Sequence, residues 1–95
     1  MPYHVYILRC ANGAFYVGHT HDLAARVAAH NAGRGSSYTR RNGPVAVVYS
    51  EIRDTEAEAV NRERQLKGWS RAKKQALMEG NLASLHALAR QHAVR

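Results

Sequence analysis

The first quarter of the chain alternates between apolar runs and a short turn signal. Residues 3–10 are mostly apolar or aromatic, and a second such run covers residues 14–18, after Asn12-Gly13. β-Branched and aromatic residues favour strands, and Asn-Gly is typical of two-residue type I′ hairpin turns. The pattern therefore predicts an antiparallel hairpin over residues 3–10 and 14–18. Because the first strand is apolar on both faces, we expect it to be central in its sheet and covered on both sides.

A helical pattern follows the hairpin directly. We expect Thr20 to cap a helix from residue 21 to about residue 32, because a hydroxyl at this position can accept a hydrogen bond from the first helical turn. Asp22 in the first turn complements the helix dipole. Gly33 or Gly35 is expected to end the helix, since glycine readily adopts the left-handed conformation found there.

The second half of the chain repeats strand and helix signals without regular alternation. The sequence of residues 45–50 predicts a third strand. Thr55 and Glu58 have the spacing of a capping box, so a helix is expected to run from there to about Gly68. Ser70 is expected to cap a further short helix that ends near residue 80.

These elements define the expected architecture. Mixed strands and helices without repeated β-α-β units indicate an α+β fold with a small three-stranded antiparallel sheet flanked by helices. We expect one domain over residues 1–80, with residues 81–95 forming a helical extension packed on the same domain. A chain of 95 residues buries only about 60 to 65% of its unfolded surface, which leaves room for a homodimer.

The net charge of the chain indicates which class of partner it binds. The net charge is +7, and eleven of the fourteen basic residues are arginine. The planar guanidinium pairs with phosphate through two parallel hydrogen bonds, so nucleic acid is the expected partner. Residues 33–44 are basic and rich in glycine, which predicts either a loop that contacts the backbone and bases or an ordinary solvated connector. The expected nucleic-acid contacts are Arg34, Tyr38, Arg40, Arg41 and Lys67.

The cysteine count and the hydropathy of the chain indicate where the protein is located in the cell. A single cysteine, Cys10, allows neither an intrachain disulfide nor a multi-cysteine zinc site. No run approaches the roughly 20 apolar residues that span a membrane, and the first residues do not resemble a leader. We therefore expect a cytoplasmic protein without membrane attachment. The pair His19 and His21 is not accompanied by a third ligand at a zinc-site spacing.

Two helical positions suggest phosphate chemistry. Arg26 and His30 are separated by four residues, so both project from one face of the first helix, where Arg26 could clamp a phosphate. Glu63 lies on the inward stripe of its helix, between Ala59 and Leu66. A carboxylate there needs either a salt bridge or a cation, and Mg²⁺ or Mn²⁺ is commonly held by one or two carboxylates. Glu63 is therefore the candidate metal ligand.

The order of these residues, together with two tyrosines, resembles the GIY-YIG nuclease family. The motifs are His4-Val5-Tyr6 in place of Gly-Ile-Tyr, Tyr16-Val17-Gly18 in place of Tyr-Ile-Gly, then Arg26, His30-Asn31 and Glu63. The resemblance covers residues 3 to about 80 and is greatest to the short stand-alone bacterial members, which are related to the nuclease module of excision repair. The first triplet lacks its glycine, and His19 stands where some relatives carry lysine.

The resemblance implies a GIY-YIG endonuclease fold and a function. The chain is expected to be a metal-dependent endonuclease that hydrolyses phosphodiester bonds in DNA, in repair or recombination, with branched or flapped DNA among its substrates. By analogy, Tyr16 is the general base and Tyr6 positions the water or the phosphate. The expected catalytic set is Tyr6, Tyr16, Arg26, His30 and Glu63. A nucleic-acid-binding module that needs a partner for turnover and an RNA-associated accessory protein remain alternatives.

Overall fold

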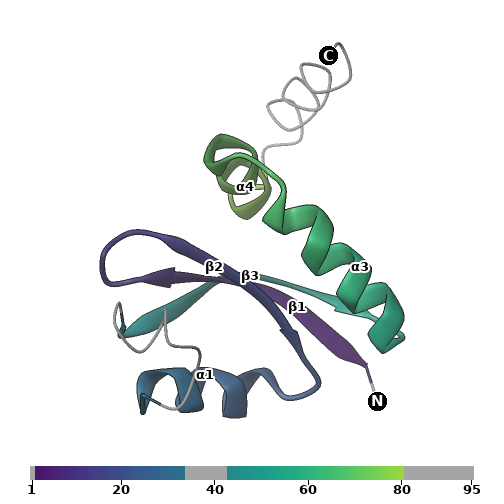
Figure 1. Ribbon diagram of the computed structural model, residues 1–95, viewed down its shortest axis with the longest axis horizontal. Helices are drawn as coiled ribbons and strands as arrows, with labels where there is room; N and C mark the ends of the chain where they lie inside the picture. The colour runs from purple at the N-terminus through teal and green to yellow at the C-terminus, as the bar shows by residue number, and fades with distance from the viewer. Residues whose placement is uncertain (1, 34–42, 81–95) are drawn as a thin grey trace.

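Three strands and three helices form the described part of the chain, which covers residues 2–33 and 43–80 of the computed structural model (Figure 1). The strands are β1 (Tyr3–Cys10), β2 (Phe15–Thr20) and β3 (Val45–Arg53), and the helices are α1 (Leu23–Asn31), α3 (Glu56–Lys67) and α4 (Arg71–Met78). The sheet is antiparallel with the order β2-β1-β3, so β1 is central. The predicted α+β class and three-stranded sheet are confirmed.

The turn between β1 and β2 differs from the prediction. Gly13 has a φ of 86°, but no residue other than glycine has a positive φ in the described ranges, so Asn12 cannot take part in a type I′ turn. The Cys10 carbonyl accepts the Gly13 N–H and the Cys10 N–H donates to the Ala14 carbonyl, both at 2.8 Å. This is a three-residue connection with glycine in the left-handed position, a common alternative to the two-residue turn.

The cap of α1 also differs from the prediction. Asp22 is the N-cap, and its carboxylate accepts the N–H of Ala25 at 3.1 Å. Thr20 is instead the last residue of β2, and its hydroxyl accepts the N–H of Asp22 at 3.1 Å. Strand pairing to β1 extends as far as Thr20, which pairs with His4 and is therefore not available as a helix cap.

The later elements follow the predicted signals closely. Thr55 caps α3 by accepting the Glu58 N–H at 3.2 Å, and Ser70 caps α4 by accepting the Lys73 N–H at 3.1 Å. The third strand is longer than expected, because β3 continues to Arg53, which pairs with Tyr3. Residues 81–95 lie outside the described ranges, so their packing stays a prediction.

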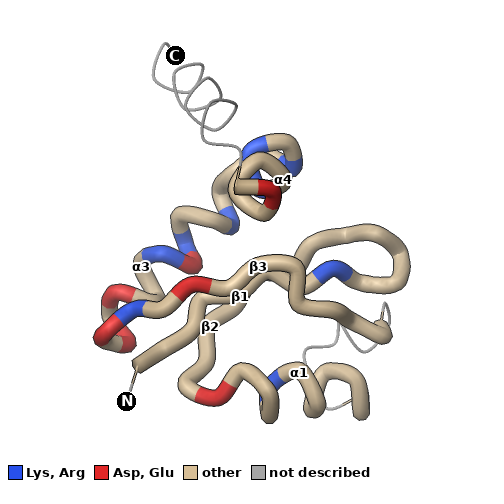
Figure 2. Tube along the Cα trace, turned by 180° about the vertical axis from the view of Figure 1, so that it is seen from behind, with Lys and Arg blue, Asp and Glu red and all other residues tan. Residues whose placement is uncertain are grey.

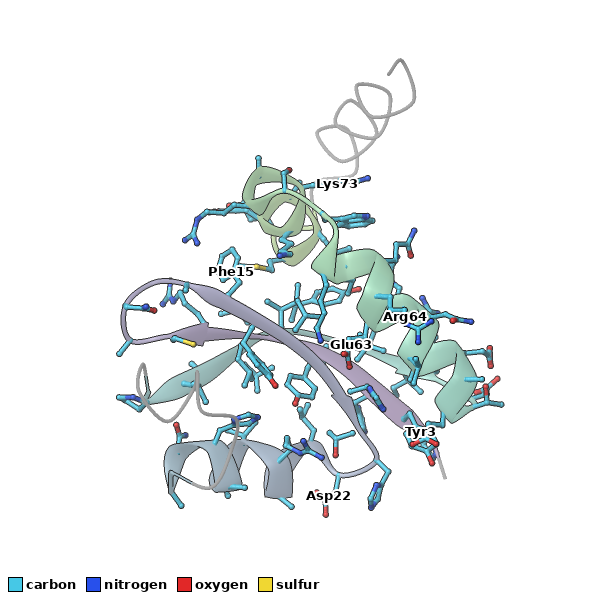
Figure 3. All side chains as sticks on the ribbon, in the orientation of Figure 1. Tyr3, Phe15, Asp22, Glu63, Arg64 and Lys73 are labelled. Atoms are coloured by element: carbon cyan, nitrogen blue, oxygen red, sulfur yellow. The ribbon has the colours of Figure 1, made fainter. Side chains whose placement is uncertain are left out.

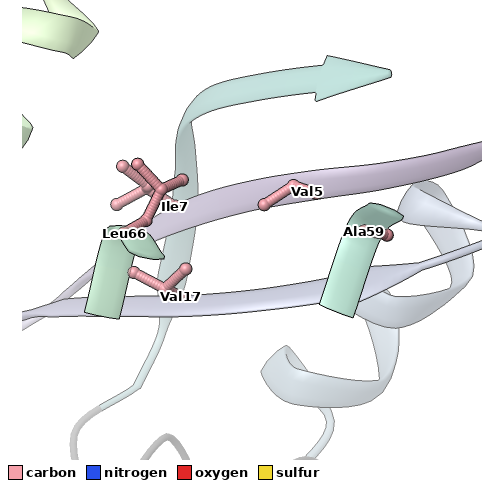
Figure 4. Close-up of a cluster of buried hydrophobic side chains, with 5 residues drawn as sticks. All are labelled: Val5, Ile7, Val17, Ala59 and Leu66. Carbon is pink, nitrogen blue, oxygen red and sulfur yellow. The ribbon is translucent and has the colours of Figure 1, made fainter. Parts of the chain in front are cut away.

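Helices cover both faces of the sheet (Figure 1). On the α3 side, the fully or almost fully buried cluster consists of Val5, Ile7, Val17, Ala59 and Leu66 (Figure 4). On the α1 side, the buried cluster consists of Tyr6, Leu8, Cys10 and Val45, with Leu23 and Val27 of α1 packed against it. Burying one large aliphatic side chain contributes roughly 1.5–3 kcal/mol, so both layers stabilise the central strand. Within the described ranges, no helix has the length and apolarity needed to cross a membrane.

Candidate active site

Tyr6 lies at the centre of the sheet, directly opposite Gly18. The two residues are paired between β1 and β2, and the Tyr6 side chain is 1% exposed. A Cβ atom added to Gly18 would lie 2.6 Å from the Tyr6 hydroxyl oxygen and 2.8 Å from Cζ. Real Cβ atoms do not approach other atoms so closely, so the phenol occupies the space that any other residue at position 18 would need. The glycine of the second triplet therefore makes room for the tyrosine of the first.

Tyr16 lies on the same face of the sheet as Tyr6, because it pairs with Leu8 two residues along β1. Its ring packs edge-on against His30, with 5.4 Å between the ring centroids. His30 comes from the last turn of α1 and is 2% exposed. The prediction that the two tyrosines lie on paired strands is correct, and the structure adds His30 as the direct neighbour of Tyr16.

Asn31 fixes the end of α1 relative to the sheet. Its side-chain amide donates to the Val45 carbonyl at 3.3 Å, and its side-chain oxygen accepts the Val45 N–H at 2.7 Å. Both backbone groups of the first residue of β3 are thus satisfied by one side chain. The His30-Asn31 pair therefore has a divided role, in which Asn31 holds the helix and His30 reaches the tyrosine.

Arg26 lies one turn before His30 on α1 and is exposed. Burial raises the pKa of Tyr6 to about 12, even though the charge of Arg26 and a hydrogen bond with it act to lower that pKa. Burial also lowers the pKa of His30, and the positive charge of Arg26 lowers it further. The Tyr6 phenol is therefore protonated and His30 is neutral at neutral pH, and the positive charge of Arg26 acts on both.

Glu63 is held by two basic side chains. His19 Nδ1 lies 2.6 Å from Glu63 Oε1, and Lys67 Nζ lies 2.7 Å from Oε2. Burial by itself would raise the pKa of the Glu63 carboxyl, but hydrogen bonds and charge from Lys67 and His19 bring it below its usual value. The carboxylate is therefore ionised at neutral pH, and 18% of its side-chain surface is exposed.

The site is assembled across the edge strand β2. Tyr6 packs on the α1 side of the sheet and Arg26 belongs to α1. Glu63 belongs to α3 on the other side (Figure 3). The negative charge of Glu63 nevertheless acts on the Tyr6 phenol and contributes to its raised pKa. Gly18 leaves β2 without a side chain opposite Tyr6, and β2 is an edge strand of the sheet that the described residues form. Arg26 and Glu63 thus both act on the phenol that lies against this glycine.

His19 is a partner of Glu63 that the sequence did not predict, since it was weighed only against a zinc site and as a replacement for the lysine of some relatives. Residues of β2 alternate between the faces of the sheet, and Val17 is buried against α3. His19, two residues later, must therefore face α3 as well, so its strand position was a usable signal. The second imidazole nitrogen, Nε2, lies 4.0 Å from the Glu56 carboxylate, so His19 bridges two turns of α3.

Of the residues predicted to contact nucleic acid, the structure describes only Lys67. Lys67 lies on α3 with a half-exposed side chain and pairs with Glu63, next to the site. Arg34, Tyr38, Arg40 and Arg41 lie outside the described residues, so their contact with nucleic acid stays a prediction.

The donor set around Glu63 fits Mg²⁺ or Mn²⁺. These ions keep most of their waters and need only one or two carboxylates, and Glu63 offers an ionised, partly accessible carboxylate. Lys67 now occupies Oε2 but is 54% exposed, so its flexible side chain can turn away and release that oxygen. In residues 2–33 and 43–80 no cluster of three or more His, Cys, Asp or Glu side chains suited to a metal is found.

Comparison with known proteins assigns this arrangement to a family. The model of the GIY-YIG catalytic domain matches residues 2–76. The chain belongs to the GIY-YIG family. A UPF0213 protein of Halobacterium salinarum is 47% identical over 75 residues, which cover 79% of this chain and 97% of the relative. A UPF0213 protein of Bacillus pumilus is 42% identical over 77 residues, covering 81% and 79%.

Two solution structures are similar to this GIY-YIG chain. The UPF0213 protein BH0048 from Bacillus halodurans is 37% identical with a TM-score of 0.55, and the match covers 85% of this chain and 86% of that one. The protein EF2693 from E. faecalis is 32% identical with a TM-score of 0.59, covering 84% and 85%. The resemblance to short stand-alone GIY-YIG proteins and the predicted fold are therefore confirmed, and membership of a nuclease superfamily implies a nucleic acid substrate.

Proposed function

We propose that this chain is a divalent-metal-dependent endonuclease that hydrolyses phosphodiester bonds in DNA. One observation carries the proposal: the buried Tyr6 phenol lies against Gly18, where β2 carries no side chain, and the charges of Arg26 and of the ionised Glu63 carboxylate both act on that phenol. Phosphodiester hydrolysis requires an activated water and compensation of the negative charge that grows on the phosphoryl oxygens. These groups are chemically suited to those tasks.

The two tyrosines have different tasks in this proposal. The pKa of Tyr6 is about 12, so its hydroxyl acts as a hydrogen-bond donor that orients the phosphate or the water and does not act as the base. Tyr16 is the proposed general base. It is only half-buried, it lies on the same face as Tyr6, and His30 fixes its ring from the side.

Charge compensation would come from Arg26 and from a cation that Glu63 would hold. Arg26 is exposed beside Tyr6 and can bind the scissile phosphate with its planar guanidinium, which stabilises the charge of the transition state. Glu63, held in place by His19, would hold Mg²⁺ or Mn²⁺. When bound, such an ion supplies further positive charge at the phosphoryl oxygens. Lys67, released from Glu63, would face the DNA strand.

Cleavage assays of defined DNA substrates test the proposal. Plain duplex, nicked, flapped and branched DNA are incubated with Mg²⁺, with Mn²⁺ or with a chelator, alongside RNA of the same sequence. We expect metal-dependent cleavage of at least one DNA substrate, abolished by Glu63→Gln and retained by Glu79→Gln, which neutralises an exposed carboxylate on α4 instead. A branched or flapped preference would agree with a role in repair or recombination. Binding without cleavage under every condition would favour a binding module, and cleavage of RNA alone would refute DNA as the substrate.

A further inference from the structure

A hollow lies at the end of the sheet, away from Tyr6 and Glu63, where the β1–β2 turn meets α4. Its volume is about 470 Å³, and arginines of two separate elements line it, Arg9 of β1 and Arg71 of α4. Between them the lining is largely apolar and includes Cys10, Pro44 and Val45. The hollow therefore combines two guanidinium groups with an apolar floor.

The cations at and beside this hollow form no ion pair within the described residues. Among the residues that the structure describes, no carboxylate lies within ion-pair distance of Arg9, Arg71 or Lys74. Lys74 lies one turn after Arg71 on α4, and burial followed by the charge of Arg71 lowers its pKa. Figure 2 shows the Lys and Arg positions on α4, with one acidic position at its end, whereas several acidic positions gather at the start of α3. Positive charge is thus concentrated here without internal compensation.

Two arginines elsewhere in the described residues, Arg53 and Arg62, form ion pairs instead. Arg53 and Arg62 both bind the Glu51 carboxylate, which places them in an internal ion-pair network. Arg71 is instead held by an aromatic ring, with its guanidinium carbon 4.2 Å from the centroid of Phe15. Stacking on a ring orients the guanidinium but leaves its in-plane N–H groups available, which is the arrangement that suits phosphate.

We propose that this hollow, lined by Arg9 and Arg71, binds a backbone phosphate of the DNA strand outside the position of cleavage. This inference rests on the proposed DNA substrate and adds a second, sequence-independent contact to it. Arg9 lies three residues from Tyr6 along β1, so their Cα atoms are about 10 Å apart at ~3.3 Å per residue. Because side chains alternate along the strand, Arg9 faces the α3 side of the sheet, like Ile7, whereas Tyr6 faces the α1 side. Phosphates of one DNA strand follow each other at ~3.4 Å along the helix axis, so the hollow lies at least about three nucleotides from the scissile bond.

The test measures the salt dependence of DNA binding without metal. Fluorescence anisotropy of a labelled duplex is recorded over a range of salt concentrations for the wild type, Arg9→Gln and Arg71→Gln. Each lost phosphate contact should reduce the slope of log affinity against log salt by about 0.9. Arg64→Gln is the matched control, because Arg64 is an exposed arginine of α3 that does not line the hollow. Arg9 makes no cation–π contact with a ring in residues 2–33 and 43–80, so Arg9→Gln remains informative if loss of the Phe15 contact unfolds Arg71→Gln.

Metal-dependent cleavage of a small phosphodiester separates this inference from the proposed function. Such a substrate is too short to reach both sites, so Arg9→Gln and Arg71→Gln should cleave it at the wild-type rate. If the salt-dependence slopes of Arg9→Gln and Arg71→Gln change no more than the slope of Arg64→Gln, the second phosphate site is refuted, whereas the proposed nuclease function is unaffected. Reduced slopes together with no cleavage by the wild type support the second site and refute the nuclease.

Discussion

Gly18→Ala places a methyl group where the Tyr6 phenol now lies. The added Cβ would be 2.6 Å from the hydroxyl oxygen and 2.8 Å from Cζ, whereas ordinary contacts begin at 3.4 Å. The hydroxyl must therefore move by about 0.8 Å, the difference between 3.4 Å and 2.6 Å. Tyr6 is 1% exposed and is enclosed by its neighbours, so the ring cannot turn away freely. Overpacking of this kind costs about 1–3 kcal/mol of unfolding free energy.

Thermal unfolding and cleavage should both report this displacement. For a domain of this size, 1 kcal/mol shifts the melting temperature by about 4–8 °C, so Gly18→Ala should melt at least ~4 °C below the wild type. A shift of almost 1 Å at a group that orients the reaction can reduce the rate by about 10²-fold, which is the expected loss of cleavage. The stability measurement does not depend on the protein being a nuclease.

A matched glycine provides the control. A Cβ added to Gly68 would lie 3.5 Å from the Gln65 carbonyl oxygen, and the φ of Gly68 is −80°, which alanine adopts without strain. Gly68→Ala should therefore leave stability unchanged or raise it slightly. In a Tyr6→Phe background the 2.6 Å contact is absent while the 2.8 Å contact remains, so the penalty of Gly18→Ala should fall without vanishing. Equal melting temperatures for Gly18→Ala and Gly68→Ala would refute the placement of the phenol over Gly18.

Further measurements test the other assignments. Glu63→Gln should reduce Mn²⁺ affinity in calorimetric titration by tenfold or more with little change in melting temperature. A lowered melting temperature with unchanged Mn²⁺ affinity would show that Glu63 stabilises the fold and does not bind the metal. Lys67→Gln should raise that affinity about two- to tenfold, since a partly exposed ion pair worth about 0.4–1.4 kcal/mol no longer competes for the carboxylate, and an unchanged affinity would contradict this competition. Tyr16→Phe should bind DNA normally but cleave about 10²-fold more slowly, and near-normal cleavage would assign the base elsewhere. The pKa of Tyr6 in the folded protein, about 12, exceeds the ordinary value of 10.0, so the stabilisation by its protonated phenol is fully present below pH 10 and is lost as the pH rises towards 12. Over that range in urea denaturation, the wild type should lose up to about 2.7 kcal/mol more unfolding free energy than Tyr6→Phe. Equal losses in the two proteins would show that the phenol is not buried.

The sequence by itself determined most of the helices and strands, and it names the catalytic candidates, whose roles stay predictions. Helix starts are encoded locally, so the capping residues Thr55 and Ser70 predicted both later helices correctly. The apolar run of β1 predicted a central strand because a strand covered on both faces needs apolar residues on both sides. Local signals failed at Asn12 and Thr20, where one extra turn residue and continued strand pairing decided the outcome.

Only the tertiary structure decided how these residues act on one another. Tyr6 and Gly18 are twelve positions apart, and the Tyr6 phenol fills the space that a side chain at position 18 would need. His19 and Glu63 are forty-four positions apart and lie in contact at 2.6 Å. No local sequence pattern predicts either contact. The protonation states follow from the same packing, because the pKa of Tyr6 rises through burial and the pKa of Glu63 falls through its basic neighbours. Residue types are written in the chain, but electrostatic interactions depend on distance and exclusion of water, and these exist only once the sheet and both helices have come together.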